Sequence, residues 1–279
     1  MKLSKRAIRV FQNRIFSWWA RNKRDLPWRH THDPYTILVS EVMLQQTQVS
    51  RVIAKYEEFL YFFPDVYTLS HATAAKVLRV WRGMGYNRRA LYLRKAAKMV
   101  VEKWKGEFSE SERQLSTLPG VGTYTARALL VFAFKKQIWA VDTNIRKIIT
   151  HFFFKGKPQK ESVIDDVAQQ LVPENKSWEW HQALMDYAAL RLRDVKRPFS
   201  QGKFSKKLRR SIPFRETNRF YRGRIVDRLR GGQVGEKKLL KELVGTYHKS
   251  EDLFQTILVG LERDGLIART KNNMVSLPA

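Results

Sequence analysis

Leu118-Pro119-Gly120-Val121-Gly122 turns the chain directly before an apolar-periodic helix that is expected to begin near Thr123. Two glycines two positions apart allow a tight turn with positive φ and leave the backbone bare. Amide groups at such a turn, followed by a helix N-terminus, point outward as a site for anions. Gly-x-Gly by itself is most often only a turn. The stretch therefore predicts a hairpin that can bind a phosphate backbone.

The charge of the chain favours the same partner. Lys and Arg number 53 against 26 Asp and Glu, which gives a formal net charge of +27. A field of that sign attracts polyanions, so nucleic acid is the leading partner. Between Arg191 and Arg224, basic residues face only Asp194 and Glu216. We expect a basic strap over 193–213 that contacts phosphates, with a solvated charged loop as the alternative.

The composition also excludes several classes of protein. The 279 residues include no Cys, which excludes disulfides, thiolate catalysis, zinc–thiolate sites and thiolate-held iron–sulfur clusters. No apolar run approaches the ~18–20 residues that a membrane span needs. The start of the chain is basic and amphipathic and lacks the apolar core of a signal peptide. We expect a soluble, cytoplasmic, nucleoid-associated protein with no cofactor and no metal.

Helical spacing of apolar residues dominates the first two-thirds of the chain. The segments with this spacing are 8–19, 49–62, 74–81, 91–104, 123–134, 145–153, 163–171 and 180–192. The pattern predicts an all-α fold, with a helical domain over 1–192, the basic strap over 193–213 and a second domain over 214–279.

The second domain has the pattern of a winged helix. Three helices are expected at Phe220–Leu229, Glu236–Val244 and Ser250–Arg263, followed by short strands at Leu266–Arg269 and Met274–Leu277. Winged helices often bind DNA through their third helix. The alternative is a winged helix that serves protein contact or packing.

Two carboxylates are candidates for chemistry. On a continuous helix, Glu41, Gln45 and Gln48 would share one face between apolar flanks. That stripe either faces solvent or lines a cleft, where apolar walls raise the pKa of a carboxyl group and suit it to act as a general acid. Asp142 precedes a helix; it is either an ordinary N-cap or a carboxylate that the helix N-terminus keeps ionised. The two pKa values would then be pushed apart, as expected for an acid beside a charge stabiliser.

Seven motifs together resemble the adenine DNA glycosylases, the MutY group of the helix–hairpin–helix glycosylase superfamily. In chain order they are Leu26-Pro27-Trp28-Arg29, Pro34-Tyr35, Ser40 to Gln48, Gly83-Met84-Gly85-Tyr86, Leu118 to Gly122, Val141 to Asn144 and His181 to Asp186. The resemblance covers about residues 5–192. It implies a two-lobed helical fold that flips a base into the cleft between the lobes, since the glycosidic bond cannot be attacked within a stacked duplex.

The resemblance also implies roles for individual residues. Glu41 would protonate the purine, and Asp142 would stabilise the oxocarbenium-like sugar while Tyr124 and Asn144 hold it in place. Residues expected beside the base pocket are Trp28, Arg29 and Gln45. Gln46 and Tyr86 would wedge into the base stack. The residues expected to contact DNA are Gln46, Gln48, Tyr86, Arg88, Leu118, Gly120, Val121, Gly122 and Thr123. Bifunctional members of the family carry Lys in place of Tyr124, so we expect a monofunctional enzyme without strand scission.

The chain departs from the family in two respects. The four Cys that hold an iron–sulfur cluster after the His181–Asp186 motif are missing. Where the family has a Nudix-like domain that recognises 8-oxoguanine, we expect the winged helix. Three hypotheses follow. The first is a monomeric glycosylase that removes adenine opposite 8-oxoguanine or guanine in double-stranded DNA. The second is a thymine or uracil glycosylase at G mismatches, and the third is a DNA-binding protein without enzymatic activity.

Overall fold

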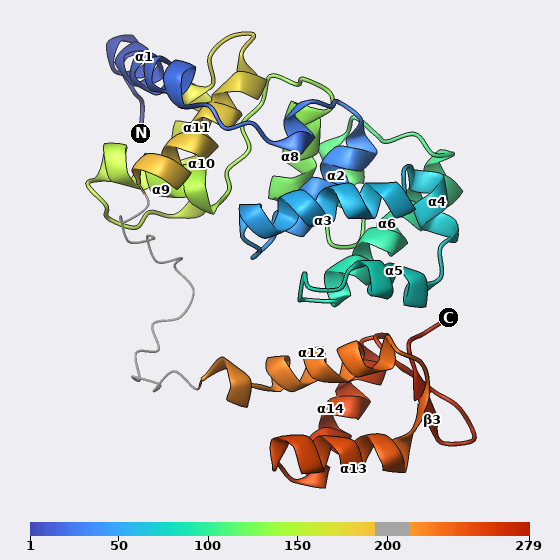
Figure 1. Ribbon diagram of the computed structural model, residues 1–279. Helices are drawn as coiled ribbons and strands as arrows, with labels where there is room; N and C mark the ends of the chain where they lie inside the picture. The colour runs from blue at the N-terminus through green and yellow to red at the C-terminus, as the bar shows by residue number, and fades with distance from the viewer. Residues whose placement is uncertain (193–212) are drawn as a thin grey trace. The chain divides into compact units, whose positions relative to one another are not determined.

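A computed structural model describes residues 1–192 and 213–279 (Figure 1). The predicted basic strap lies outside the described residues, except for Pro213. Fourteen α-helices account for most of the described residues. They are α1 (Lys5–Asn22), α2 (Pro34–Leu44), α3 (Val49–Phe62), α4 (Val66–His71), α5 (Ala74–Val80), α6 (Arg88–Trp104), α7 (Glu112–Leu115), α8 (Thr123–Phe132), α9 (Thr143–Phe154), α10 (Glu161–Leu171), α11 (Ser177–Arg191), α12 (Asn218–Leu229), α13 (Glu236–Tyr247) and α14 (Glu251–Arg263).

Short elements complete the described chain. They are the 3-10 turns η1 (Pro27–Arg29) and η2 (Phe214–Glu216) and the strands β1 (Val234–Gly235), β2 (Ala268–Arg269) and β3 (Met274–Ser276). The predicted fold class, all-α with helices at the periodic segments, is confirmed. Two compact units contain the described residues: unit 1 has 1–41, 108–117 and 121–192, and unit 2 has 42–107, 118–120 and 213–279.

Unit 1 has its core among α1, α9, α10 and α11, and Figure 1 shows α1 and α11 close together. Phe11 and Ile15 lie one turn apart on α1 and are both buried, which places them on the apolar face of an amphipathic helix. The ring of Phe11 meets Trp180 of α11 edge to face, with centroids 5.8 Å apart. This core fixes α9 and α11, and both helices carry residues of the site described below.

Unit 2 contains the packed helices α3 to α6 and the C-terminal helices. Phe59, Phe63 and Trp81 form an aromatic cluster, with Phe59 4.9 Å from Phe63 and 5.8 Å from Trp81 between ring centroids. The three helices expected in the winged-helix region are present as α12, α13 and α14. The expected hairpin strands are present as β2 and β3, and β3 also pairs with β1, so the antiparallel sheet has the order β1-β3-β2. β1 was not expected, because Val234-Gly235 shows no alternating pattern and its partner strand β3 lies about 40 residues further along the chain.

Candidate active site

Glu41 is a buried carboxyl group on α2. Asp33 caps the start of α2 by accepting hydrogen bonds from Tyr35 N at 3.2 Å and Thr36 N at 3.1 Å. The helix is apolar on nearly all sides, and Leu38 and Val39 are fully buried beside Glu41. Glu41 itself is 7% exposed. A carboxyl group in such surroundings favours its neutral form.

Tyr124, in the first turn of α8, is the hydrogen-bond partner of Glu41. Its hydroxyl donates to the Glu41 carboxylate. Burial raises the pKa of Glu41 to about 7; the bond from Tyr124 opposes that rise, and the nearby Asp142 adds to it. The pKa of Tyr124 lies well above its ordinary value, because of burial and the two neighbouring carboxylates. Tyr124 therefore remains a neutral hydrogen-bond donor near pH 7.

Asp142 caps the N-terminus of α9 and uses both of its oxygens. Oδ1 accepts from Asn144 N at 2.9 Å and from Ile145 N at 2.7 Å, while Oδ2 accepts from Asn144 Nδ2 at 2.9 Å. Donors that point at a carboxylate and the helix dipole both favour its ionised form. The structure thus brings Glu41, Tyr124, Asp142 and Asn144 together in unit 1, although their segments lie far apart in the sequence. The arrangement pairs a carboxyl group that is readily protonated with an anion.

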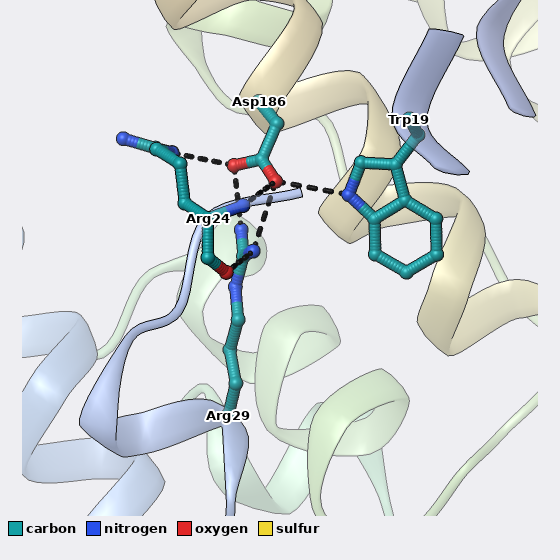
Figure 2. A network of polar contacts seen from close by, with 4 residues as sticks. All are labelled: Trp19, Arg24, Arg29 and Asp186. Atoms are coloured by element: carbon teal, nitrogen blue, oxygen red, sulfur yellow. Dashed lines mark hydrogen bonds and ion pairs between the residues drawn. The ribbon is translucent and has the colours of Figure 1, made fainter. Parts of the chain in front are cut away.

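Trp28 and Arg29 lie in η1, and Arg29 belongs to a network of polar contacts around Asp186 of α11 (Figure 2). Asp186 is fully buried. Its carboxylate accepts from Trp19 Nε1 at 2.9 Å, from Arg24 N at 3.1 Å and from Arg24 Nε at 2.6 Å. Arg29 adds bonds from Nη1 at 2.9 Å and from Nη2 at 2.8 Å. This network fixes the segment that carries Trp28, which is 9% exposed.

The prediction that Glu41, Gln45 and Gln48 share one helical face is wrong. α2 ends at Leu44, and Gln46 has a φ of 56°, in the left-handed region that breaks a helix. Gln48 is the N-cap of α3. Gln46 and Gln48 are exposed and Gln45 is half-buried.

Arg89 of α6 explains why α2 ends where it does. Its Nη1 donates to Val42 O at 2.9 Å, to Met43 O at 3.0 Å and to Gln45 O at 2.5 Å. These carbonyls lie at the C-terminal end of α2, where helices leave carbonyls without partners. Burial lowers the pKa of Arg89 to about 10, so the guanidinium remains charged at neutral pH. No pattern in the sequence singles out Arg89, because the α2 carbonyls that it binds lie more than 40 residues away.

The same guanidinium binds a second turn, which carries Tyr86. Nη2 donates to Met84 O at 3.1 Å and Gly85 O at 3.3 Å, and Arg89 lies over the Tyr86 ring at 5.4 Å. Tyr86 has a φ of 46° and is 38% exposed. Arg88, next in the chain to Arg89, is exposed and stacks its guanidinium on Tyr92 at 5.4 Å.

The hairpin at residues 116–122 joins α7 to α8. Gly120 has a φ of 81°, and a Cβ at this position would lie 2.9 Å from Tyr92 Cβ, so a side chain does not fit. Leu118 and Val121 are buried and anchor the turn, while Gly122 and Thr123 are exposed. Gly122, the N-cap of α8, supplies no side chain to the first amides of the helix. The N-cap therefore gives those amides no side-chain acceptor, and helix N-termini of this kind are a common site for anions in proteins.

No cluster of three or more His, Asp or Glu side chains that could hold an ion exists among residues 1–192 and 213–279. The iron–sulfur cluster that the family resemblance implies does not fit this chain, because its cysteine ligands are missing. None of the described helices has the length and apolar character needed to cross a membrane.

Comparison with known proteins assigns the family. Residues 39–174 match the HhH-GPD superfamily of base excision DNA repair proteins. The adenine DNA glycosylase of Mycobacterium tuberculosis is 31% identical over 96% of this chain and 94% of that protein. The chain therefore belongs to the adenine DNA glycosylase family. The stretch of this DNA glycosylase that matches the superfamily includes the C-terminal part of α2, the α7–α8 hairpin and α9.

Two further matches show how the likeness is distributed. The adenine DNA glycosylase of Buchnera aphidicola is 34% identical over 65% of this chain, which spans about half (52%) of that relative. A solved structure of a thermostable thymine-DNA glycosylase has a TM-score of 0.63 and 29% identity, covering 66% of this chain and 87% of the other. The helical glycosylase domain is thus shared among enzymes that are named for different bases.

Proposed function

We propose that this DNA glycosylase hydrolyses the N-glycosidic bond of an adenine flipped out of double-stranded DNA, opposite 8-oxoguanine or guanine, and that it acts as a monomer. The observation that carries the proposal is the pairing of Glu41, with a pKa of about 7, and the helix-capping Asp142. An acid that is substantially protonated near neutral pH can protonate a leaving base. An anion beside it can stabilise the positive charge that develops on the sugar.

In the proposed reaction, Glu41 donates its proton to N7 of the adenine, and the bond between the base and C1′ breaks with its electron pair leaving on the base. Asp142 stabilises the oxocarbenium-like sugar, and water then adds to C1′ and gives its proton to the carboxylate that Glu41 has become. Asn144 holds Oδ2 of Asp142 at 2.9 Å, and the Tyr124 hydroxyl holds the Glu41 carboxyl. Trp28 and Gln45 are proposed to contact the base, whereas the Arg29 guanidinium, predicted to lie beside the base pocket, is bonded to Asp186 and is proposed to hold the segment that carries Trp28.

DNA binding is proposed to rest on two groups of residues. Gln46, Gln48, Tyr86 and Arg88 lie at exposed positions of unit 2, and the first two belong to the turn that Arg89 holds. The hairpin Leu118 to Thr123 offers the first amides of α8 to phosphate oxygens. We propose that both groups act without an iron–sulfur cluster, so the purified protein should be colourless and free of stoichiometric iron.

The test is a panel of duplexes carrying A, T or U opposite G, C or 8-oxoguanine, followed by alkali cleavage at abasic sites. Release of adenine supports the proposal, and release of thymine or uracil without adenine overturns it in favour of the second hypothesis, which the likeness to the thymine-DNA glycosylase supports. Omitting alkali tests the monofunctional assignment, because a tyrosine at 124 cannot form a Schiff base. Tyr124→Lys is the matched variant, and borohydride should trap a DNA adduct only with this variant.

A further inference from the structure

His181 of α11 is a buried imidazole that the proposed chemistry does not use. It is 2% exposed, and both ring nitrogens have backbone partners. Nε2 accepts a hydrogen bond from Ala140 N at 2.9 Å, and Nδ1 donates to Ser177 O at 2.6 Å. A backbone amide can only donate and a carbonyl can only accept, so these partners require the neutral ring with its proton on Nδ1. Burial lowers the pKa of His181 to about 4, which keeps Nε2 an acceptor at neutral pH.

The partner of Nε2 belongs to a segment without regular structure. α8 ends at Phe132 and α9 begins at Thr143, and no helix or strand lies between them. Backbone groups in such a segment depend on partners from elsewhere. Ser177, one turn before His181 on α11, donates its Oγ to Ile138 O at 2.8 Å. α11 therefore holds residues 138–140 at two points, and Ala140 is fully buried there.

Asp142 follows two residues after Ala140, directly at the start of α9. We propose that His181 is a positioning residue, whose neutral Nε2 fixes Ala140 and thereby sets where the Asp142 carboxylate meets the sugar of the flipped nucleotide. This inference rests on the proposed function, because the role of Asp142 is part of that function. Displacement of a catalytic group by about 1 Å can cost on the order of 100-fold in rate.

The first test separates the hydrogen bond from the volume of the ring. His181→Phe keeps a ring but has no acceptor, whereas His181→Gln offers Oε1 in place of Nε2. We expect His181→Phe to lower the single-turnover rate of base release by roughly 10- to 100-fold at saturating enzyme, with DNA affinity unchanged. His181→Gln should restore most of the rate. Leu171→Ala, which removes a buried side chain of α10 from the same core, measures how much rate a loss of stability alone removes.

The second test asks whether His181 acts through Asp142. In an Asp142→Asn background, His181→Phe should cause no further loss of rate, because residues that act as a unit are not additive. A full additional loss in that background would overturn the proposal. An equal loss of the single-turnover rate in Leu171→Ala at matched stability would also overturn the proposal. A rate in His181→Gln as low as that in His181→Phe would overturn it as well.

A measurement on the wild-type protein keeps the proposal testable if His181→Phe does not fold. ¹⁵N NMR of the imidazole should show a proton on Nδ1 and none on Nε2, and the Ala140 amide should be protected from hydrogen exchange. A proton on Nε2 would overturn the proposal. Absence of base release from wild-type protein on every duplex would refute the proposed function, whereas an active wild type with a fully active His181→Phe variant would refute only the role of His181.

Discussion

Arg29 and Asp186 meet at two points, with Nη2 2.8 Å from Oδ1 and Nη1 2.9 Å from Oδ2 (Figure 2). Burial alone would raise the pKa of Asp186, but the bonds from Arg29 and Arg24 outweigh it, and the pKa lies below its ordinary value. Because the pKa of Asp186 is lower in the folded state, its carboxylate stabilises the fold at pH values above its unfolded pKa. This contribution to the free energy of unfolding is lost as the pH falls through the folded pKa. α11 thus anchors the η1 segment through Asp186, as it anchors residues 138–140 through His181.

Asp186→Asn should strongly destabilise unit 1. The substitution leaves the guanidinium of Arg29, with 7% of its side chain exposed, buried without an anionic partner. Removing one partner of a buried pair costs about 3–5 kcal/mol, and the partial exposure of Arg24 puts the expected loss near the lower end. Urea unfolding at pH 7 measures the change. Asp25→Asn, in an exposed pair with His30, is the control and should have little effect; equal losses in both variants would contradict the importance of the network.

The rate of base release should fall as the pH rises above 7. Glu41 must be protonated to act as an acid, and its pKa of about 7 means that each further pH unit removes about nine-tenths of the active form. Glu41→Gln should lower the single-turnover rate by roughly 10²–10⁴-fold, with DNA affinity retained. The measurement is the pH–rate profile on the best duplex at saturating enzyme. A profile that stays flat from pH 6 to 9 would show that Glu41 is not the acid.

Tyr124→Phe should move the alkaline limb of that profile to higher pH. The Tyr124 hydroxyl lowers the pKa of Glu41 by bonding to its carboxylate, so its removal lets burial and Asp142 raise the pKa further. The variant should therefore retain more of its maximal rate at pH 8 than the wild type does. A limb that moves to lower pH would contradict the hydrogen bond between the two side chains.

Arg89→Met should weaken DNA binding and lower the melting temperature. The variant leaves the carbonyls at the end of α2 and those of the Tyr86 turn without their shared donor. Lys95→Met is the matched control, because it removes the same charge from an exposed position on α6. Fluorescence anisotropy with a labelled duplex measures affinity. If both variants lost affinity equally, the effect would come from net charge and not from the turns.

Of the three C-terminal helices, α13 and not α14 should contact DNA. The exposed side chains of α13 include Lys237, Lys238 and Lys241, whereas α14 exposes Glu251 and Asp252. Each lost lysine–phosphate contact should reduce the salt slope of DNA binding by about 1. Lys237→Gln with Lys241→Gln is therefore expected to reduce the slope by about 2. The matched pair on α14, Glu251→Gln with Asp252→Asn, should not weaken binding. A loss of affinity in this α14 pair alone would contradict the assignment.

Sequence reasoning succeeded where structure depends on neighbours in the chain. The period of apolar residues located α3, α9 and α14, and the two glycines at 120 and 122 located the turn before α8. The second glycine differs from the expectation in one respect: Gly122 has a φ of −96°, so only Gly120 requires the left-handed region.

Sequence reasoning failed where the decisive contact comes from far away. The polar spacing of residues 41–48 fits a continuous helix, and nothing within that stretch reveals that a guanidinium on α6 binds the carbonyls of Val42, Met43 and Gln45. His181 lay within a recognised motif, but its partner at Ala140 is 41 residues away. A pattern of residue types does not specify which backbone group a buried polar side chain will reach.

Because one guanidinium closes both the turn after α2 and the turn before α6, neither loop is free to be redesigned by itself. An insertion that lengthened the Gln46 loop would release Arg89 and loosen the Tyr86 loop, even though the latter had kept its sequence. Engineering of either loop should therefore treat the two loops as a single part, and exchange them together with the arginine that joins them.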